Sequence, residues 1–150
     1  MTVEIIFKKT TSSCGNIISF NHVVNEKSYM DLWTTLTSDS RGYQVYYTYK
    51  HNVADYSYTL GWGSYPLGSI VKISYSKNEN VYKTYVNGKE VDSKTLNNLT
   101  GFDINSFKIG AAENGYNFTG HVYSVRVYNR ALTANEINNN NIVDKYRFGI

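Results

Sequence analysis

The residues best suited to chemistry in this chain are aromatic rings interleaved with asparagines. A pyranose stacks its apolar face on an exposed Trp or Tyr, while amide groups hydrogen-bond its hydroxyls. Trp33 and Tyr46 stand out of phase with the apolar alternation of their own segments, which indicates that they face away from a core. The sequence therefore predicts a sugar-binding surface formed by Trp33, Tyr46, Trp62, Tyr65, Asn114, Tyr116 and Asn117.

An alternative interpretation places the same rings inside the fold. Trp62 continues a stripe formed by Tyr56, Tyr58 and Leu60, which is the pattern of a core-facing strand. Trp33 would then pack on a second sheet or on a partner. Both interpretations stay open at the level of sequence.

The histidines and the cysteine show no catalytic pattern. His22, His51 and His121 have neither a Ser-His-Asp order nor metal-ligand spacing. Cys14 lies in an expected turn beside Gly15, and a lone cysteine excludes an intramolecular disulfide. We interpret these side chains as structural or solvated.

Length and charge exclude several classes of protein. The chain has 150 residues, with 15 Lys and Arg against 12 Asp and Glu, a net charge of +3. This length suits one domain of about 100–200 residues. The basic residues are scattered, so no nucleic-acid partner is predicted. No apolar run approaches the roughly 18 residues that a membrane span needs, and the N-terminus does not have the pattern of a signal peptide.

Along the chain, short segments of alternating apolar and polar residues are separated by turn residues, which is typical of antiparallel strands. Asn87-Gly88 is a strong signal for a tight hairpin, because both positions accept positive φ. Further turns are predicted at residues 50–55, at Gly61, Gly63 and Pro66, and at 77–80. Strands are predicted over residues 3–8, 16–20, 29–36, 42–49, 56–62, 70–75, 81–86, 89–91, 107–111 and 121–128.

Two local features are predicted near the C-terminus. In the last strand Val122, Val125 and Val127 would pack inward, with an irregularity between 122 and 125. Thr133 and Glu136 then form a capping box, which predicts a short helix that ends within residues 138–141. Leu132 and Ile137 occupy the staple positions. Residues 142–150 are left open as a final strand or a docked arm.

Several segments together resemble one family. YVNGKEV (85–91), FKIGA (107–111) and FTGHVYSVRVYNRALTANEI (118–137) resemble the laminin-G-like branch of the concanavalin A-like lectin/glucanase superfamily. Residues 2–20 resemble an early strand pair of such domains. The resemblance implies an all-β fold: an antiparallel β-sandwich of jelly-roll form with one short C-terminal helix.

The resemblance also bears on domain organisation. It implies a single laminin-G-like domain over residues 1–150, although such domains normally begin with strands ahead of the segment that matches residues 2–20. The chain is therefore expected to be a shortened jelly roll or a part of a larger protein. An incomplete sheet leaves an unpaired edge, so an oligomer or an attachment to a larger assembly is expected.

The superfamily includes glucanases, which carry two neighbouring carboxylates about 5 Å apart on one strand. We identify no glutamate with a second carboxylate two residues away, and most glutamates lie in expected turns or caps: Glu4, Glu26, Glu79, Glu90, Glu113 and Glu136. We therefore predict that the chain is not an enzyme. Relatives often bind calcium, which needs about six to eight oxygen ligands. Asp31, Asp39, Asp55, Asp92 and Asp103 are spread out, so no cofactor is predicted and calcium alone is left open.

These observations predict a non-catalytic carbohydrate-binding and adhesion module that recognises a cell-surface glycan. The tail over residues 138–150 resembles those of phage structural and bacterial surface proteins, which implies a virion or an extracellular surface as the location. The main alternative is a decoration or assembly domain of a capsid or tail, with other subunits as partners. A degenerate glucanase is a third possibility.

Overall fold

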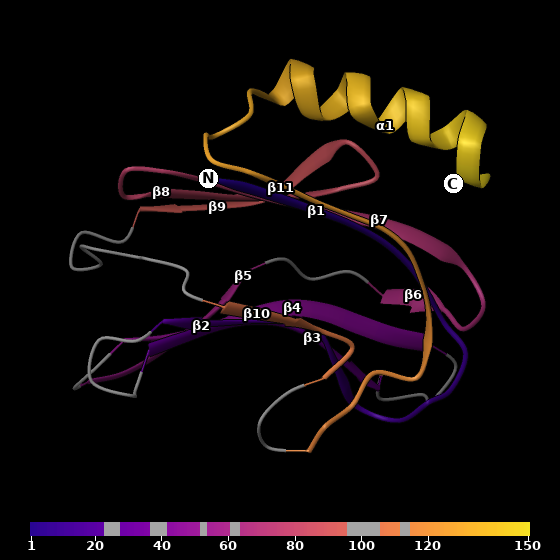
Figure 1. The fold of residues 1–150 in the computed structure, drawn as a ribbon, viewed down its shortest axis with the longest axis horizontal. Helices are drawn as coiled ribbons and strands as arrows, with labels where there is room; N and C mark the ends of the chain where they lie inside the picture. Colours follow the sequence, from indigo (N-terminus) through magenta and orange to yellow (C-terminus); the bar gives the residue numbers. More distant parts are fainter. Residues whose placement is uncertain (23–27, 37–41, 52–53, 61–63, 96–105, 112–114) are drawn as a thin grey trace. The chain divides into compact units, whose positions relative to one another are not determined.

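A computed structural model describes the chain except residues 23–27, 37–41, 52–53, 61–63, 96–105 and 112–114, with side chains described over 1–19, 65–95, 107–111 and 115–150. The chain divides into two compact units (Figure 1). The first unit comprises Met1–Thr10, Gly68–Asn98 and Gly120–Ile150, and the second comprises Thr11–Leu67 and Leu99–Thr119. Within the described ranges, no helix is long and apolar enough to cross a membrane.

The first unit is built on a five-stranded antiparallel sheet in the order β11-β1-β7-β8-β9. Strand β1 is an inner strand that is hydrogen-bonded along both edges, because it pairs with β11 on one side and with β7 on the other. The strands are β1 (Thr2–Lys9), β7 (Ile70–Asn78), β8 (Val81–Val86), β9 (Lys89–Thr95) and β11 (Gly120–Tyr128).

One face of this sheet is apolar. The register of β1 and β7 sets Val3 opposite Tyr75 and Ile5 opposite Ile73. These four side chains are at most 1% exposed. Directly opposite residues of an antiparallel pair share a face, so the alternation predicted for β1 and β7 produces this core surface.

The other face of the sheet is polar and lies beneath helix α1 (Ala134–Phe148), as Figure 1 shows. Glu4 stands opposite Ser74 on β7 and opposite Arg126 on β11. Tyr85, Leu132 and Ile137 form a small buried cluster here. The predicted staple between Leu132 and Ile137 is therefore confirmed, and it fixes the entry of the chain into the helix.

The second unit contains a six-stranded antiparallel sheet in the order β10-β2-β3-β4-β5, with β6 paired to β4. The pairing of its strands shows which residues of neighbouring strands lie opposite one another. The strands are β2 (Gly15–His22), β3 (Ser28–Leu36), β4 (Gly42–His51), β5 (Ala54–Leu60), β6 (Ser64–Pro66) and β10 (Ser106–Ile109).

The hairpin between β8 and β9 is confirmed in detail. Asn87 has φ 48° and Gly88 has φ 84°, the left-handed values that a tight two-residue turn requires. The turn predicted over residues 77–80 is wrong, because Lys77 and Asn78 pair with Tyr82 and Val81 and so extend β7. Only Glu79 and Asn80 lie between β7 and β8.

Two other predicted turns are shorter than the sequence indicated. The loop over residues 50–55 is wrong at both ends, because β4 runs to His51 and pairs it with Ala54 of β5. Pro66 does not lie in a turn but ends strand β6, opposite Gly42. Proline has no N–H to donate to a neighbouring strand. It is tolerated at this position because β6 pairs with β4 alone.

The irregularity predicted in the last strand is confirmed. The register between β1 and β11 shifts between Ile6 and Phe7, which face Ser124 and Val122 and leave Tyr123 as the extra residue. The prediction that Val127 packs inward is wrong, since it is 48% exposed. Its strand β11 lies at the edge of the sheet, where a side chain has neighbours on one side only.

Helix α1 is much longer than predicted. The capping box is present, with the backbone N–H of Glu136 donating to Thr133 Oγ1 and the Thr133 N–H donating to Glu136 Oε2. However, the helix does not end within residues 138–141, and the tail is not a strand but a helical segment that docks on the sheet through Asp144. Helix α1 continues to Phe148 and is capped by Gly149, which has φ 71°. Side chains that dock on the sheet compensate for the low helix propensity of asparagine.

The start of α1 gives a first prediction. Hydrogen bonds from Arg130 and then from Thr133 lower the pKa of Glu136 from 4.5 to about 2. We expect Arg130→Gln to raise this pKa toward its usual value, as measured by NMR titration of the side-chain carboxyl. Because the folded-state pKa is depressed, the stabilisation is present above pH 4.5 and is lost as the pH falls toward 2. An unchanged pKa in the variant would contradict this assignment.

Candidate functional site

Two of the predicted ligand-binding residues are direct neighbours in the second unit. The register of β3 and β4 pairs Trp33 with Tyr46. Residues that are directly opposite in an antiparallel pair share a face of the sheet. The pairing therefore puts two aromatic positions next to each other, although they are 13 positions apart in sequence (46 minus 33).

The same line of residues continues across the sheet. Asn16 on β2 is the register partner of Trp33, and Asn117 forms a parallel bridge with Asn16. We call these four positions, Asn117, Asn16, Trp33 and Tyr46, the cross-strand row. It places two amides beside two aromatic residues, the two residue types that a sugar site combines.

Asn16 is a member of this row that the sequence analysis missed. It is fully buried, and among the described residues neither its side-chain nitrogen nor its oxygen has a hydrogen-bond partner. A buried amide without partners is costly, so such groups usually mark a special role. The only signal in the sequence is an asparagine at the start of an apolar strand.

Backbone hydrogen bonds hold the segment that carries Tyr116 and Asn117 against strand β2. The Asn16 N–H donates to the Tyr116 carbonyl at 3.0 Å, and the Phe118 N–H donates to the Gly110 carbonyl at 2.9 Å. The Tyr116 side chain is 54% exposed, and Asn117 is also exposed. An accessible ring and an accessible amide thus lie at the β2 end of the row.

The close approach of Gly15 to this segment gives a second prediction. A Cβ atom at Gly15 would lie 2.6 Å from the Asn117 carbonyl oxygen and 2.8 Å from Phe118 Cα. Both are backbone atoms that cannot swing away, so Gly15→Ala should destabilise the fold by about 1 to 3 kcal/mol in urea denaturation. The exposed change Ser13→Ala is the control and should have little effect. Equal stability of the two variants would show that the close packing is not required.

The remaining predicted residues have different outcomes. Tyr65 lies on β6 opposite Tyr43, and burial raises the pKa of its hydroxyl. Trp62 and Asn114 lie outside the described residues. That the Trp33 and Tyr46 rings face away from the core stays a prediction.

The calcium ligands that the sequence left open lie on scattered elements. Asp31 is on β3, Asp55 on β5 and Asp92 on β9, whereas Asp39 and Asp103 lie outside the described residues. In the described part of the chain, no group of three His, Cys, Asp or Glu side chains is placed to hold a metal ion. Cys14 is exposed in the turn between β1 and β2, as predicted.

One pair of carboxylates has the spacing of a glucanase but not its geometry. Glu90 and Asp92 stand two residues apart on β9, so the expectation that no glutamate has a second carboxylate at this spacing is wrong. The register between β8 and β9 shifts at this point, so Glu90 pairs with Tyr85 and Asp92 pairs with Thr84. Tyr85 and Thr84 are consecutive and face opposite sides of the sheet. The bulge therefore separates the two carboxylates instead of bringing them together.

The most highly charged cluster of the described residues lies in the first unit, beneath α1. Lys72 Nζ is 2.9 Å from Glu4 Oε1 and 2.8 Å from Asp144 Oδ2, and all three side chains are at most 1% exposed. Arg126 Nη1 donates to Asp144 Oδ2 at 2.7 Å and lies 3.3 Å from Glu4 Oε2. Two acids and two bases balance, so we interpret this ionic cluster as the anchor of the helix.

The pKa of Asp144 reflects this environment. Burial alone would raise the pKa of the Asp144 carboxyl, but hydrogen bonds from Arg126 and Lys72 lower it below its usual 3.8. The Arg126 pKa is raised, first by its hydrogen bond to Asp144. Sequence reasoning missed the cluster because its members are distant along the chain.

Comparison with known proteins decides the family. A family model described as "Concanavalin A-like lectin/glucanases superfamily" matches residues 2–138, which is most of the chain. The chain belongs to this superfamily. The resemblance found in its closing segments is therefore confirmed, as is the all-β, jelly-roll fold class with a C-terminal helix. A search of curated proteins gives no match.

Several solved structures share the fold at low sequence identity. The CBM40 of the Ruminococcus gnavus IT-sialidase, bound to α2,3 sialyllactose, has a TM-score of 0.68 and 19% identity, over 93% of this chain and 81% of that one. A heptameric SAP-like pentraxin from Limulus polyphemus has a TM-score of 0.69 and 14% identity, over 91% and 67%. Domain 4 of the arabinanase AbnA from Geobacillus stearothermophilus, in complex with arabinotriose, has a TM-score of 0.68 and 18% identity, over 92% and 64%.

Proposed function

We propose that this chain is a non-catalytic carbohydrate-binding module that recognises a glycan through the cross-strand row. The observation that carries the proposal is the register that aligns Asn117, Asn16, Trp33 and Tyr46 across three strands and a bridge. The aromatic positions supply stacking and the exposed Asn117 amide supplies hydrogen bonds to hydroxyl groups, whereas the buried Asn16 connects the rings with Asn117. Fold relatives solved with sialyllactose and with arabinotriose support a glycan as the ligand.

The absence of catalysis is part of the same proposal. The bulge that separates Glu90 from Asp92 supports it, because glycoside hydrolysis needs two carboxylates that flank one scissile bond, and residues on opposite faces of a sheet cannot do so. Incubation with a panel of β-glucans should release no reducing ends. Release of product that is lost in a Glu90→Gln variant would revive the third possibility, a degenerate glucanase.

The biological setting follows from the adhesion role. We expect a single sugar site to bind in about the millimolar-to-micromolar range, so useful adhesion needs several copies on one particle. We place the module on a virion or another extracellular surface, where an oligomer or a larger assembly supplies that multiplicity. Size-exclusion chromatography with light scattering of the full chain tests whether it assembles by itself.

A second candidate function is a structural role in assembly, through protein contacts. The outer face of α1 favours it, because Ile142 is 46% exposed, Val143 is 63% exposed and Tyr146 is 91% exposed. Exposed apolar residues that gather on one surface often mark a protein interface. In this alternative the helix face, rather than the cross-strand row, would meet other capsid, tail or surface subunits.

A glycan array probed with the full chain tests the proposed function. The array should include sialylated and arabinose-containing oligosaccharides, the classes present in the relatives solved with ligand. We expect saturable binding to at least one class. A folded protein that binds no glycan at any concentration tested would overturn the proposal and leave the structural role as the better explanation.

A further inference from the structure

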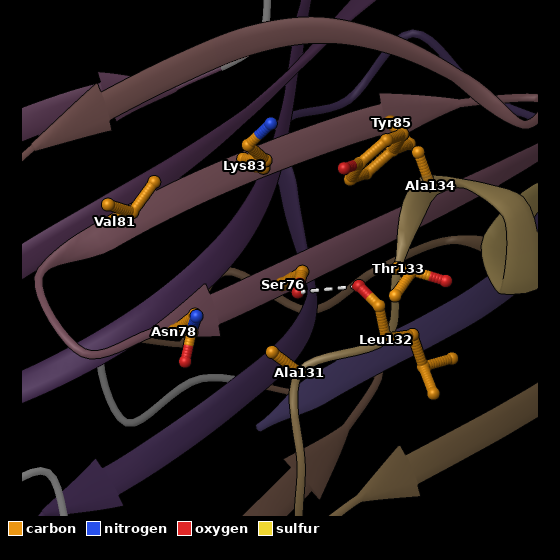
Figure 2. Close-up of a pocket in the computed structure, with 9 residues that line it drawn as sticks. All are labelled: Ser76, Asn78, Val81, Lys83, Tyr85, Ala131, Leu132, Thr133 and Ala134. Atoms are coloured by element: carbon orange, nitrogen blue, oxygen red, sulfur yellow. Dashed lines mark hydrogen bonds between the residues drawn. The ribbon is translucent and has the colours of Figure 1, made fainter.

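A hollow of about 300 Å³ opens on the helix side of the first unit. Figure 2 shows that strands β7 and β8 form one wall and that the segment entering α1 forms the other. Its main contributors are Ser76, Val81, Lys83, Tyr85, Ala131 and Leu132. All of them belong to the first unit, whereas the cross-strand row belongs to the second.

The polar groups of the hollow can both donate and accept hydrogen bonds. Lys83 Nζ lies 2.9 Å from Glu90 Oε2, and the two side chains are 40% and 38% exposed. Each therefore keeps hydrogen-bonding capacity toward solvent beyond the bond that they share. Asn78, whose amide both donates and accepts, is exposed at the mouth of the hollow.

The hydroxyl of Tyr85 adds an acceptor deeper in the hollow, because its own proton is donated to the Glu90 carboxylate. The Tyr85 side chain is 2% exposed, and its hydroxyl points into the space between the two walls in Figure 2. Burial, with a smaller effect of the Glu90 carboxylate, raises the pKa of this phenol. The hydroxyl therefore stays protonated over the physiological range.

The floor between these groups is apolar. Leu132 is 5% exposed and Val81 is 37% exposed, and the Tyr85 ring packs on the buried cluster with Leu132. Ser76 Oγ already donates a hydrogen bond to the Leu132 carbonyl at 3.4 Å, so it has little hydrogen-bonding capacity left for a ligand. An apolar floor with polar groups around it suits a molecule with an apolar face and a polar rim.

We propose that this hollow is a second ligand site, one that takes a single uncharged hexopyranose ring. Its volume is at the small end of ligand pockets, which suits one ring rather than a chain enclosed along its length. The positive charge that Lys83 brings to the wall is balanced by Glu90 at 2.9 Å, so the site does not favour an anion. Lys83 supplies a donor, and the Asn78 amide supplies a donor and an acceptor, to hydroxyls of the ring.

The proposal is tested by backbone-amide NMR titration of the full chain with methyl β-D-galactopyranoside, methyl α-D-mannopyranoside and methyl β-D-glucopyranoside. We expect saturable shifts in β7, β8 and residues 131–134 for at least one probe, with a millimolar dissociation constant. Sodium D-glucuronate serves as the charged comparator and should bind more weakly. Tighter binding of glucuronate would overturn the assignment of an uncharged ligand, and no saturable shift with any probe would overturn the site.

Three variants separate this site from the cross-strand row. Ala131→Phe fills the hollow from its rim and should abolish these shifts, whereas Ala111→Phe, at a similarly half-exposed alanine of the second unit, should not. Trp33→Ala should leave them intact. If Ala131→Phe binds the probe as well as the unaltered chain does, the hollow is not the site, and this outcome leaves glycan binding at the cross-strand row untouched.

Discussion

Replacing Asp144 with Asn should lower the free energy of unfolding by about 3 kcal/mol, the lower part of the range for breaking a buried ion pair. The reason is that Lys72 and Arg126 both contact this carboxylate, and Lys72 is fully buried. The loss stays in the lower part of that range because Lys72 keeps Glu4 at 2.9 Å. Urea denaturation followed by tryptophan fluorescence and circular dichroism measures it.

The matched control is an ion pair of similar length on the surface. Lys83 and Glu90 are 2.9 Å apart but are 40% and 38% exposed, so solvent screens their attraction. Glu90→Gln should therefore leave the urea midpoint close to that of the unaltered chain. If both variants lose the same stability, burial of the ionic cluster is not what anchors α1.

The stability lost in Asp144→Asn should depend on pH in a defined direction. The folded-state pKa of Asp144 lies below its usual 3.8, so its stabilisation is fully present above that value. It is lost as the pH falls through the folded-state pKa, because both states then bind the proton. The difference between the two proteins should therefore be constant near neutral pH and should shrink in acid. A difference that grows on acidification would contradict the assigned pKa direction.

The second large effect concerns binding. Trp33→Ala and Tyr46→Ala should each weaken binding of the best glycan from the array by about tenfold or more, the loss expected for an aromatic hot spot. The two positions are register partners, so removing both should cost less than the sum of the single losses. Isothermal titration calorimetry measures all three variants.

Tyr146→Ala is the control for this prediction. Tyr146 is 91% exposed on the outer face of α1, so its removal should change neither folding nor glycan affinity. If Tyr146→Ala weakens binding and Trp33→Ala does not, the ligand lies on the helix rather than on the cross-strand row. The structural role through the helix face would then gain support.

Local signals in the sequence predicted much of the fold. The Asn87-Gly88 hairpin and the capping box at Thr133 depend on a few adjacent residues, and both are confirmed. The irregular strand over Val122 and Val125 was visible as a break in alternation, and the register shift confirms it. Such features depend on a few neighbouring residues, so they can be predicted without knowing which distant parts of the chain are in contact.

Features that depend on distant contacts were missed or shortened. Residues 138–141 are four asparagines that by propensity end a helix, yet Asn140 donates to Glu4 at 2.9 Å and Asp144 bonds Lys72. These contacts link the helix to strands near the opposite end of the sequence. The row was visible only in part, because the role of Asn16 follows from its pairing with Asn117 and Trp33.

The most direct measurement of the central claim is a backbone-amide NMR titration of the Ala131→Phe chain with the best-binding oligosaccharide from the array. Filling the hollow removes the second ligand site, so the remaining shifts report on the second unit alone. We predict saturable shifts centred on β3, β4 and residues 115–118. Saturable shifts confined to α1 and the five-stranded sheet, with none along the row, would contradict the account.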